Sequence, residues 1–208
     1  MSEYFVPAGS GEAEFVEKRS SFLGHVRFVE TEDAARDFIN EMKKKHYDAR
    51  HNCWCYIIRG GAVRYSDDGE PQGTAGLPML EVFKREGVEN VVCVVTRYFG
   101  GVLLGTGGLL RAYTKSAKDA LDAAGIAAVR RWVKLEVGCP YSLLERMKTE
   151  CLSLDGAVQN VDYGADVLLS LLLPENNADA FSVRVTELSA GACSAQTVGE
   201  ELMPVKIK

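Results

Sequence analysis

The apolar run VVCVV at residues 91–95 is the strongest pattern along the chain. Five consecutive apolar residues predict a strand that is covered on both faces, because neither face meets water. This segment is therefore the expected central strand of a sheet. Extended segments are also predicted on both sides of KRSS at 18–21. NCWCYIIR at 52–59 predicts another strand, and AVRYS at 62–66 its return strand.

Three helices are predicted among these strands. Thr31 precedes a segment with apolar residues at helical spacing, acidic residues in its first turn and lysines in its last, which suits the helix dipole. LPMLEVFKREG at 77–87 predicts a helix that ends at its glycine. GGLLRAYTKSAKDALDAAG at 107–125 predicts a long helix with the same kind of ending.

A second set of elements begins near residue 128. The order is β-α-β-β-α-β within about 75 residues, which is typical of the ferredoxin-like fold. The chain is therefore expected to be α+β, with one domain over residues 1–127 and a second over 128–208.

Composition narrows the classes of function. The net charge of −5 argues against a protein that coats nucleic acid with its whole surface, so such binding would need a local patch. Six scattered cysteines form no C-x-x-C pair, and MSEYFVPAGSGEAEF lacks the basic region and apolar core of a secretory signal. We therefore expect a cytoplasmic protein with no disulfide partner, and no apolar run is long enough to span a membrane.

RYFGGVLLGTGGLLRAY at 97–113 places five glycines between the central strand and the long helix. Free N–H groups at such a helix start can face an anion, with Arg97 and Arg111 as cationic partners. The P-loop pattern fails because Thr106 stands where lysine is required, and the dinucleotide pattern fails at Leu110. The alternative is that the glycines only permit a turn and close packing.

YSDDGEPQGTAG at 65–76 is rich in carboxylates, and three interpretations are open. Asp67, Asp68 and Glu70 could hold a divalent cation such as Mg²⁺. The segment could instead be a tight turn in which Thr74 caps the following helix. Finally, its carboxylates could pair with the two arginines of the glycine-rich segment.

HYDARHNCWCY at 46–56 offers thiol and imidazole groups. On a strand, His51, Cys53 and Cys55 point to one face, and His46 is a conceivable fourth zinc ligand. The spacing is a poor match to structural zinc sites. A thiol nucleophile at Cys53 with His51 as its base is the other possibility, against the alternative of ordinary buried cysteines.

Taken together, HYDARHNCWCY, YSDDGEPQGTAGLP and VVTRYFGGVLLGTGGLLRAY resemble the YigZ/IMPACT family over residues of about 12–125. The resemblance implies a two-layer α/β first domain like a ribosomal-protein domain and domain IV of elongation factor G. It implies a second domain like domain V of that factor. By this resemblance, eukaryotic members act in translational control through an extra N-terminal domain, which we do not expect in this protein. Cys55 departs from the family pattern, in which a small residue is usual, and this weakens the zinc hypothesis.

The leading hypothesis is a regulatory protein of translation, and not an enzyme, that binds RNA or a ribosomal surface and needs no cofactor. The competing one is a Mg²⁺-dependent enzyme acting on a phosphorylated small molecule or nucleotide. A third is a purely structural cluster of charges.

Lys115 and Lys118 share a helical face with Arg111 and could extend a basic patch. The candidate ligand- or nucleic-acid-binding residues are His51, Asp67, Asp68, Glu70, Thr74, Arg97, Tyr98, Gly100, Gly101, Gly105, Thr106, Gly107, Gly108, Arg111 and Lys115.

Overall fold

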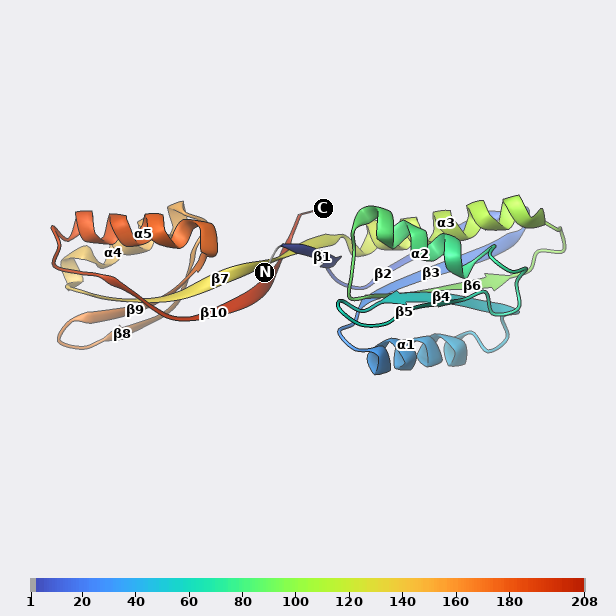
Figure 1. Ribbon diagram of the computed structural model, residues 1–208, viewed down its shortest axis with the longest axis horizontal. Helices are drawn as coiled ribbons and strands as arrows, with labels where there is room; N and C mark the ends of the chain where they lie inside the picture. The colour runs from blue at the N-terminus through green and yellow to red at the C-terminus, as the bar shows by residue number, and fades with distance from the viewer. Residues whose placement is uncertain (1–2, 208) are drawn as a thin grey trace. The chain divides into compact units, whose positions relative to one another are not determined.

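The computed structural model describes residues 3–207, so the first two residues of the predicted lead-in and the last of the predicted second domain lie outside it. The chain forms two compact units, and the change from the first to the second falls between Ala128 and Val129 (Figure 1). Residues 204–207 also belong to the first unit. No helix within residues 3–207 is long and apolar enough to cross a membrane.

The first unit, here the N-terminal unit, contains most of the elements. In chain order they are β1 (Tyr4–Pro7), β2 (Gly11–Glu17), β3 (Ser20–Phe28), α1 (Glu32–Lys45), β4 (His51–Ile57), β5 (Val63–Ser66), α2 (Gly76–Glu86), β6 (Val91–Tyr98) and α3 (Gly105–Ala124).

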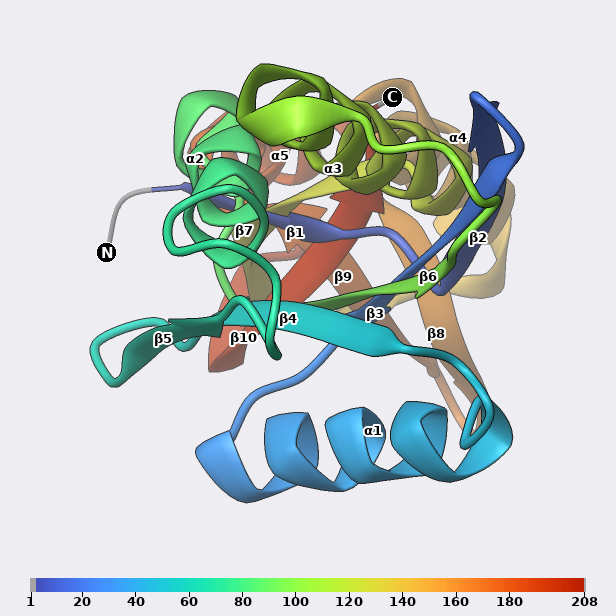
Figure 2. The ribbon, with the colours of Figure 1, turned by 90° about the vertical axis from the view of Figure 1, so that its right-hand side faces the viewer.

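The sheet of the N-terminal unit has the strand order β2-β3-β6-β4-β5, and each strand is antiparallel to its neighbours. The expected central strand β6 is indeed in the middle and is buried from Val91 to Arg97. Helices α2 and α3 cover one face of this sheet, and α1 covers the other (Figure 2). The unit therefore has three layers, one more than the family resemblance implies. The reason is that Val92 and Val94 form an apolar face that α1 covers.

Local signals set several boundaries as predicted. The Thr31 hydroxyl accepts a hydrogen bond from the backbone N–H of Ala34 at 3.1 Å and caps α1. Gly87 ends α2 with φ 67°, the left-handed conformation that glycine adopts without a steric penalty. The KRSS break is a tight turn, in which Lys18 and Arg19 both have positive φ. These features depend on neighbouring residues alone, and this is why the sequence predicts them.

Strand β1 lies inside the segment expected to be a lead-in. Its position is fixed by partners far along the chain: Glu89 N–H donates to the Phe5 carbonyl at 2.9 Å, and Ala8 N–H donates to Gly125 at 3.0 Å. A four-residue strand carries too little periodicity to be recognised from the sequence.

The second unit contains β7 (Ile126–Cys139), which begins in the first, then a 3₁₀ turn (Tyr141–Leu143), α4 (Leu144–Ser153), β8 (Ala157–Tyr163), β9 (Val167–Pro174), α5 (Glu175–Leu188) and β10 (Ala195–Lys206). The sheet has the strand order β7-β9-β8, and both β10 and β1 pair with β7. The order β10-β7-β9-β8 with two helices is the ferredoxin-like arrangement expected from the sequence. Met147 of α4 and Phe181 of α5 share one hydrophobic core with Val137 and Leu171 of the sheet. All six cysteines of the chain are free and buried.

Two buried histidines lie where α1 meets the sheet. His25 pairs in register with Val94 and therefore shares its face, and the His25 and His46 rings are 5.4 Å apart. Burial lowers the pKa of both imidazoles below the ordinary value. Glu12 Oε1 is 3.3 Å from His25 Nδ1, but the geometry is not that of a hydrogen bond, so neither ring nitrogen of His25 has a partner within residues 3–207. The folded chain therefore favours neutral rings more strongly than the unfolded chain does.

We therefore expect the N-terminal unit to lose stability as the pH falls below about 6.5, because the unfolded chain then takes up protons that the folded chain does not. His25→Gln should reduce this loss. The measurement is urea unfolding at pH 7.5 and 5.5, followed by Trp54 fluorescence in a Trp132→Phe parent, since the chain has 2 tryptophans. An equal loss in parent and variant would contradict the assignment.

Candidate functional site

Strand register places three side chains in one row across the sheet. Phe22 on β3 and His51 on β4 are the direct partners of Arg97 on β6. Direct partners on antiparallel strands project to the same face, which here is the face covered by α2 and α3. Arg97 therefore points beneath these helices rather than into solvent, and it is only 5% exposed.

A buried ion pair occupies this position. Arg97 Nη1 donates to Glu70 Oε1 at 2.7 Å, and the Tyr113 hydroxyl donates to the same oxygen at 2.8 Å. Arg97 Nη2 also reaches the Ser20 hydroxyl at 3.4 Å. Burial raises the pKa of the Tyr113 phenol well above its ordinary value, so the group stays protonated and donates to the carboxylate. One cluster thus joins β6, α3 and the acidic turn, defined here as residues 67–76.

Asp67 organises the acidic turn. Its carboxylate accepts backbone N–H bonds from Gly73 at 2.8 Å, Ala75 at 3.1 Å and Gly76 at 2.8 Å. The last two donors lie at the start of α2 and the first lies within the turn. Thr74 was the expected cap, but its hydroxyl donates to the Pro71 carbonyl at 2.7 Å instead. The start of α2 is thus capped by Asp67 and not by Thr74, so the predicted residue is wrong. The chain folds back far enough to bring a carboxylate from several positions upstream.

Asp68 has separate partners. Lys43 Nζ donates to its Oδ1 at 2.8 Å and the Asn52 N–H donates to its Oδ2 at 2.7 Å, while His51 Nδ1 is 2.9 Å from its carbonyl oxygen. Asp67 thus bonds to α2, Asp68 to α1 and β4, and Glu70 to Arg97. The three carboxylates do not converge on one point. Within residues 3–207, no three His, Cys, Asp or Glu side chains are grouped so that they could hold a metal ion.

The glycine-rich loop between β6 and α3 uses its glycines in two ways. A Cβ on Gly100 would lie 2.0 Å from the carbonyl carbon of Arg19, so only glycine allows this close approach to the β2–β3 turn. The Gly100 N–H donates to the Ser20 hydroxyl at 3.2 Å. Gly105 starts α3 with φ 70°, and no side chain caps this helix at Leu104. The first N–H groups of α3 are therefore left available to a ligand.

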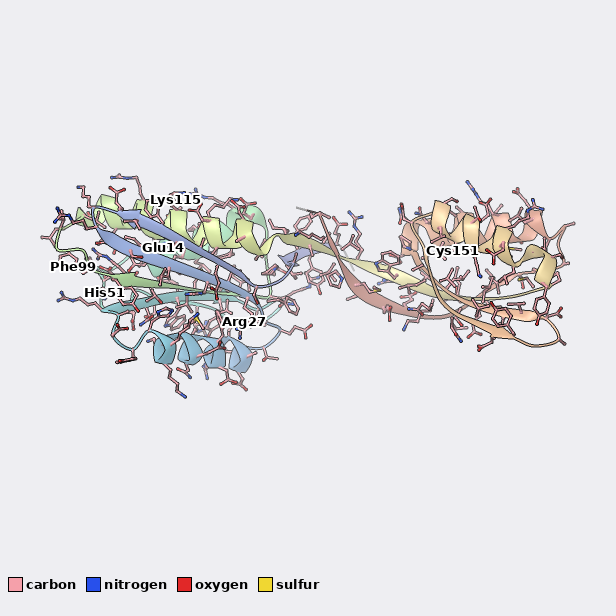
Figure 3. All side chains as sticks on the ribbon, turned by 180° about the vertical axis from the view of Figure 1, so that it is seen from behind. Glu14, Arg27, His51, Phe99, Lys115 and Cys151 are labelled. Atoms are coloured by element: carbon pink, nitrogen blue, oxygen red, sulfur yellow. The ribbon has the colours of Figure 1, made fainter. Side chains whose placement is uncertain are left out.

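A hollow of about 370 Å³ lies between the acidic turn and the loop. Figure 3 shows two of its lining residues, His51 and Phe99, at the same end of the N-terminal unit. We call it the loop pocket. It is lined by Arg50, His51, Gly69, Glu70, Pro71, Arg97, Phe99, Leu103, Leu104, Gly105, Thr106 and Leu109.

Of the candidate residues, His51, Glu70, Arg97, Gly105 and Thr106 line this pocket. The structure brings them together from four separate segments of the chain.

Other candidates lie elsewhere. Tyr98 follows Arg97 and so points to the opposite face, where its hydroxyl donates to Asp48 at 3.1 Å. Gly108, Arg111 and Lys115 line a second hollow, which lies between α3 and β2. A Cβ on Gly107 would be 3.6 Å from Arg111 Nη1, so this guanidinium lies against the first turn of α3.

The thiol and zinc hypotheses do not fit the geometry. Cys53 Sγ donates to the Asp67 carbonyl at 2.9 Å, and His51 bonds to Asp68, so thiol and imidazole do not meet. Burial raises the pKa of the Cys53 and Cys55 thiols far above the ordinary value. Both thiols remain protonated and belong to the core.

The sequence does not single out the other lining residues of the loop pocket, of which Phe99 and Arg50 offer an aromatic ring and a positive charge. Phe99 is 42% exposed although it is aromatic, and Arg50 is exposed just before β4. Both stand beside candidate residues, Tyr98 and His51. The alternation of side chains on a strand could have indicated that Arg97 and Phe99 share a face.

Comparison with known proteins covers both units. Residues 18–121 match the family model of the Impact N-terminal domain, and residues 137–192 match a domain of unknown function, DUF1949. IMPACT family member YvyE of Bacillus subtilis is 37% identical over 193 residues, covering 92% of this chain and 89% of that protein. IMPACT family member YigZ of Escherichia coli is 33% identical over 206 residues, covering 96% and 100%.

A eukaryotic relative matches part of the chain, and a solved structure matches nearly all of it. The protein IMPACT homolog of Dictyostelium discoideum is 36% identical over 95 residues, which is 43% of this chain and 27% of that protein. A solved structure described as a crystal structure of an hypothetical protein has a TM-score of 0.60 and 32% identity, covering 96% of this chain and 98% of that one.

The role of Asp67 as the cap of α2 predicts a large effect on stability. Asp67→Ala should lower the free energy of unfolding of the N-terminal unit by about 2 kcal/mol, because three backbone donors lose their acceptor. Urea unfolding followed by Trp54 fluorescence in the Trp132→Phe parent measures it. The control is Asp122→Ala, which removes only an exposed pair with Lys118 and should change stability by less than about 0.5 kcal/mol. Equal effects of the two substitutions would show that Asp67 does not cap the helix.

Proposed function

The chain belongs to the IMPACT family, and from this premise we propose that it is a cytoplasmic, translation-associated protein whose N-terminal unit binds RNA, free or on a ribosomal surface. The observation that carries the proposal is a group of exposed cations without ion-pair partners around the glycine-rich loop. The translational role of eukaryotic family members supports the same direction, and so does the family's likeness to ribosomal-protein and elongation-factor domains, although likeness of fold is weaker support than the site itself.

Four such cations lie near the loop. Lys18 and Arg19 form the turn against which Gly100 packs, Arg50 lines the loop pocket, and Arg111 lies against the first turn of α3. All four are exposed, and within residues 3–207 none has a carboxylate within ion-pair distance. Their charges are therefore available to phosphate groups.

Most other cations of the unit are neutralised by the protein itself. Lys115 pairs with Asp119 at 2.7 Å, and Lys118 pairs with Glu86 at 3.4 Å and also with Asp122. The predicted stripe along α3 is thus reduced to Arg111. A chain of net charge −5 can still bind a polyanion, provided that the unpaired cations gather in one place.

The competing enzyme hypothesis lacks support from the acidic turn. A Mg²⁺ site needs oxygen ligands that converge, whereas Asp67, Asp68 and Glu70 each bond to a different set of protein groups. The structural hypothesis accounts for Arg97, which meets the protein's own carboxylate. It does not account for Arg111, which has no carboxylate partner within residues 3–207. The contrast between the two arginines favours a surface that binds an external anion.

The test uses a fluorescent single-stranded RNA of twelve uridines and fluorescence anisotropy between 50 and 300 mM KCl. We expect the affinity to fall steeply with salt, and Arg111→Ala or Arg19→Ala to weaken binding several-fold. Each substitution should also lower the slope of log K against log[KCl] by about 0.7 for every phosphate group that the variant no longer binds.

Arg85→Ala is the matched control. Arg85 is exposed and lies about 14 Å along α2 from Gly76, the start of the helix, given the rise of an α-helix. This variant should bind like the wild type. Affinity that does not depend on salt, or equal weakening by Arg111→Ala and Arg85→Ala, would contradict the proposal.

A further inference from the structure

The loop pocket has features that the RNA-backbone contact does not use. It is concave, it has one apolar wall, and its floor is a pair of buried charged groups. Phosphate contacts with Arg19 or Arg111 require none of these. The pocket therefore needs an explanation of its own.

We propose that the loop pocket binds a single nucleotide, with the base against Phe99 and the 5′-phosphate at the N-terminus of α3. This deepens the proposed RNA contact, on which it rests, by naming the part of the RNA that leaves the surface and enters the protein. The chemistry recognised is a nucleoside 5′-phosphate, supplied by the end of an RNA strand or by a free nucleotide.

The position of the phosphate follows from the start of α3. Leu104 provides no side-chain cap, and within residues 3–207 no hydrogen-bond acceptor meets the N–H groups of Gly105, Thr106 and Gly107. Four N–H groups at a helix start point outward and carry the positive end of the helix dipole, so they form an anion site. Arg50 lines the same pocket and adds a full positive charge.

The floor gives a second, independent indication of a ligand. The Glu70 side chain is 4% exposed and lines the pocket, and within residues 3–207 its Oε2 has no hydrogen-bond partner. Buried polar groups in proteins are almost always paired, so an unpaired oxygen at a pocket is best explained by a donor that a ligand brings. Sugar hydroxyls and base N–H groups are donors of this kind.

Glu70 fixes the orientation of the nucleotide. Both hydrogen bonds to its carboxylate, from Arg97 and Tyr113, use Oε1, and within residues 3–207 none is found at Oε2. A carboxylate oxygen accepts from hydroxyl or amino groups and repels a phosphate. The sugar or base therefore faces the floor, and the phosphate faces the rim at α3.

The wall completes the match. Phe99 offers a ring that is 42% exposed, and Leu103 beside it is 82% exposed. Exposed aromatic rings next to cations are the usual platforms on which unpaired bases stack. A volume of about 370 Å³ is at the small end of ligand pockets, so one nucleotide enters and a longer stretch does not.

The experiment is calorimetry on the full chain with uridine 5′-monophosphate, uridine and inorganic phosphate as separate probes. We expect the monophosphate to bind at least tenfold tighter than uridine or phosphate alone. Phe99→Leu keeps an apolar side chain and should weaken the monophosphate about tenfold. Phe28→Leu is the control, because Phe28 is similarly exposed at 39% but lies at the far end of β3 from Ser20. Circular dichroism checks that both variants fold.

Two RNA arms identify the source of the nucleotide. If the end of a strand enters the pocket, twelve uridines with a 5′-phosphate should bind tighter than the same RNA with a 5′-hydroxyl. The difference should disappear in Phe99→Leu. If a free nucleotide enters, the monophosphate binds but the two RNAs are equal.

The proposal is overturned if phosphate binds as tightly as the monophosphate, which would mean an anion site only, or if Phe99→Leu and Phe28→Leu behave alike. If the monophosphate test fails but Arg111→Ala still weakens RNA binding, the pocket proposal is wrong and the proposed RNA contact is retained. Loss of all RNA binding, with a monophosphate that still depends on Phe99, would instead overturn the RNA contact alone.

Discussion

The ion pair between Arg97 and Glu70 is the interaction on which the site depends. Both groups are buried, and a buried charge without a partner is strongly destabilising, so each holds the other in place. Glu70 belongs to the acidic turn and Arg97 to the central strand, while Tyr113 brings in the long helix through the same oxygen. The pair therefore sets the distance between the turn and the start of α3, and the loop pocket is the space that remains.

The two arginines of the glycine-rich segment have different roles. Arg97 neutralises a carboxylate of the protein, whereas Arg111 lies outward against the first turn of α3 and has no carboxylate partner within residues 3–207. The family motifs thus contain both residues that stabilise the fold and exposed residues that can bind a ligand. Asp67 and Asp68 hold helices and strands, and the glycines permit a close approach at Gly100 and an open helix start at Gly105. Only what remains unpaired can meet a ligand.

Features that depend on neighbouring residues were predictable from the sequence. The Thr31 cap, the Gly87 helix end and the buried strand around VVCVV follow from local chemistry. The contacts of the site do not, because Glu70 and Arg97 are separated by 27 residues and meet only when the acidic turn packs beside the central strand. For the same reason the cap of α2 was assigned to Thr74, the nearest hydroxyl, although Asp67 performs it. Burial of Arg97 could not be read from its charge.

The most direct test of this account is a double-mutant cycle between Glu70 and Arg97. Glu70→Ala, Arg97→Ala and the double variant are compared by urea unfolding, with Trp54 fluorescence in the Trp132→Phe parent. Each single substitution leaves a buried charge unpaired, so we expect the double variant to be destabilised by about 2 kcal/mol less than the sum of the single effects. Additivity within about 0.5 kcal/mol would show that the pair does not hold the site together.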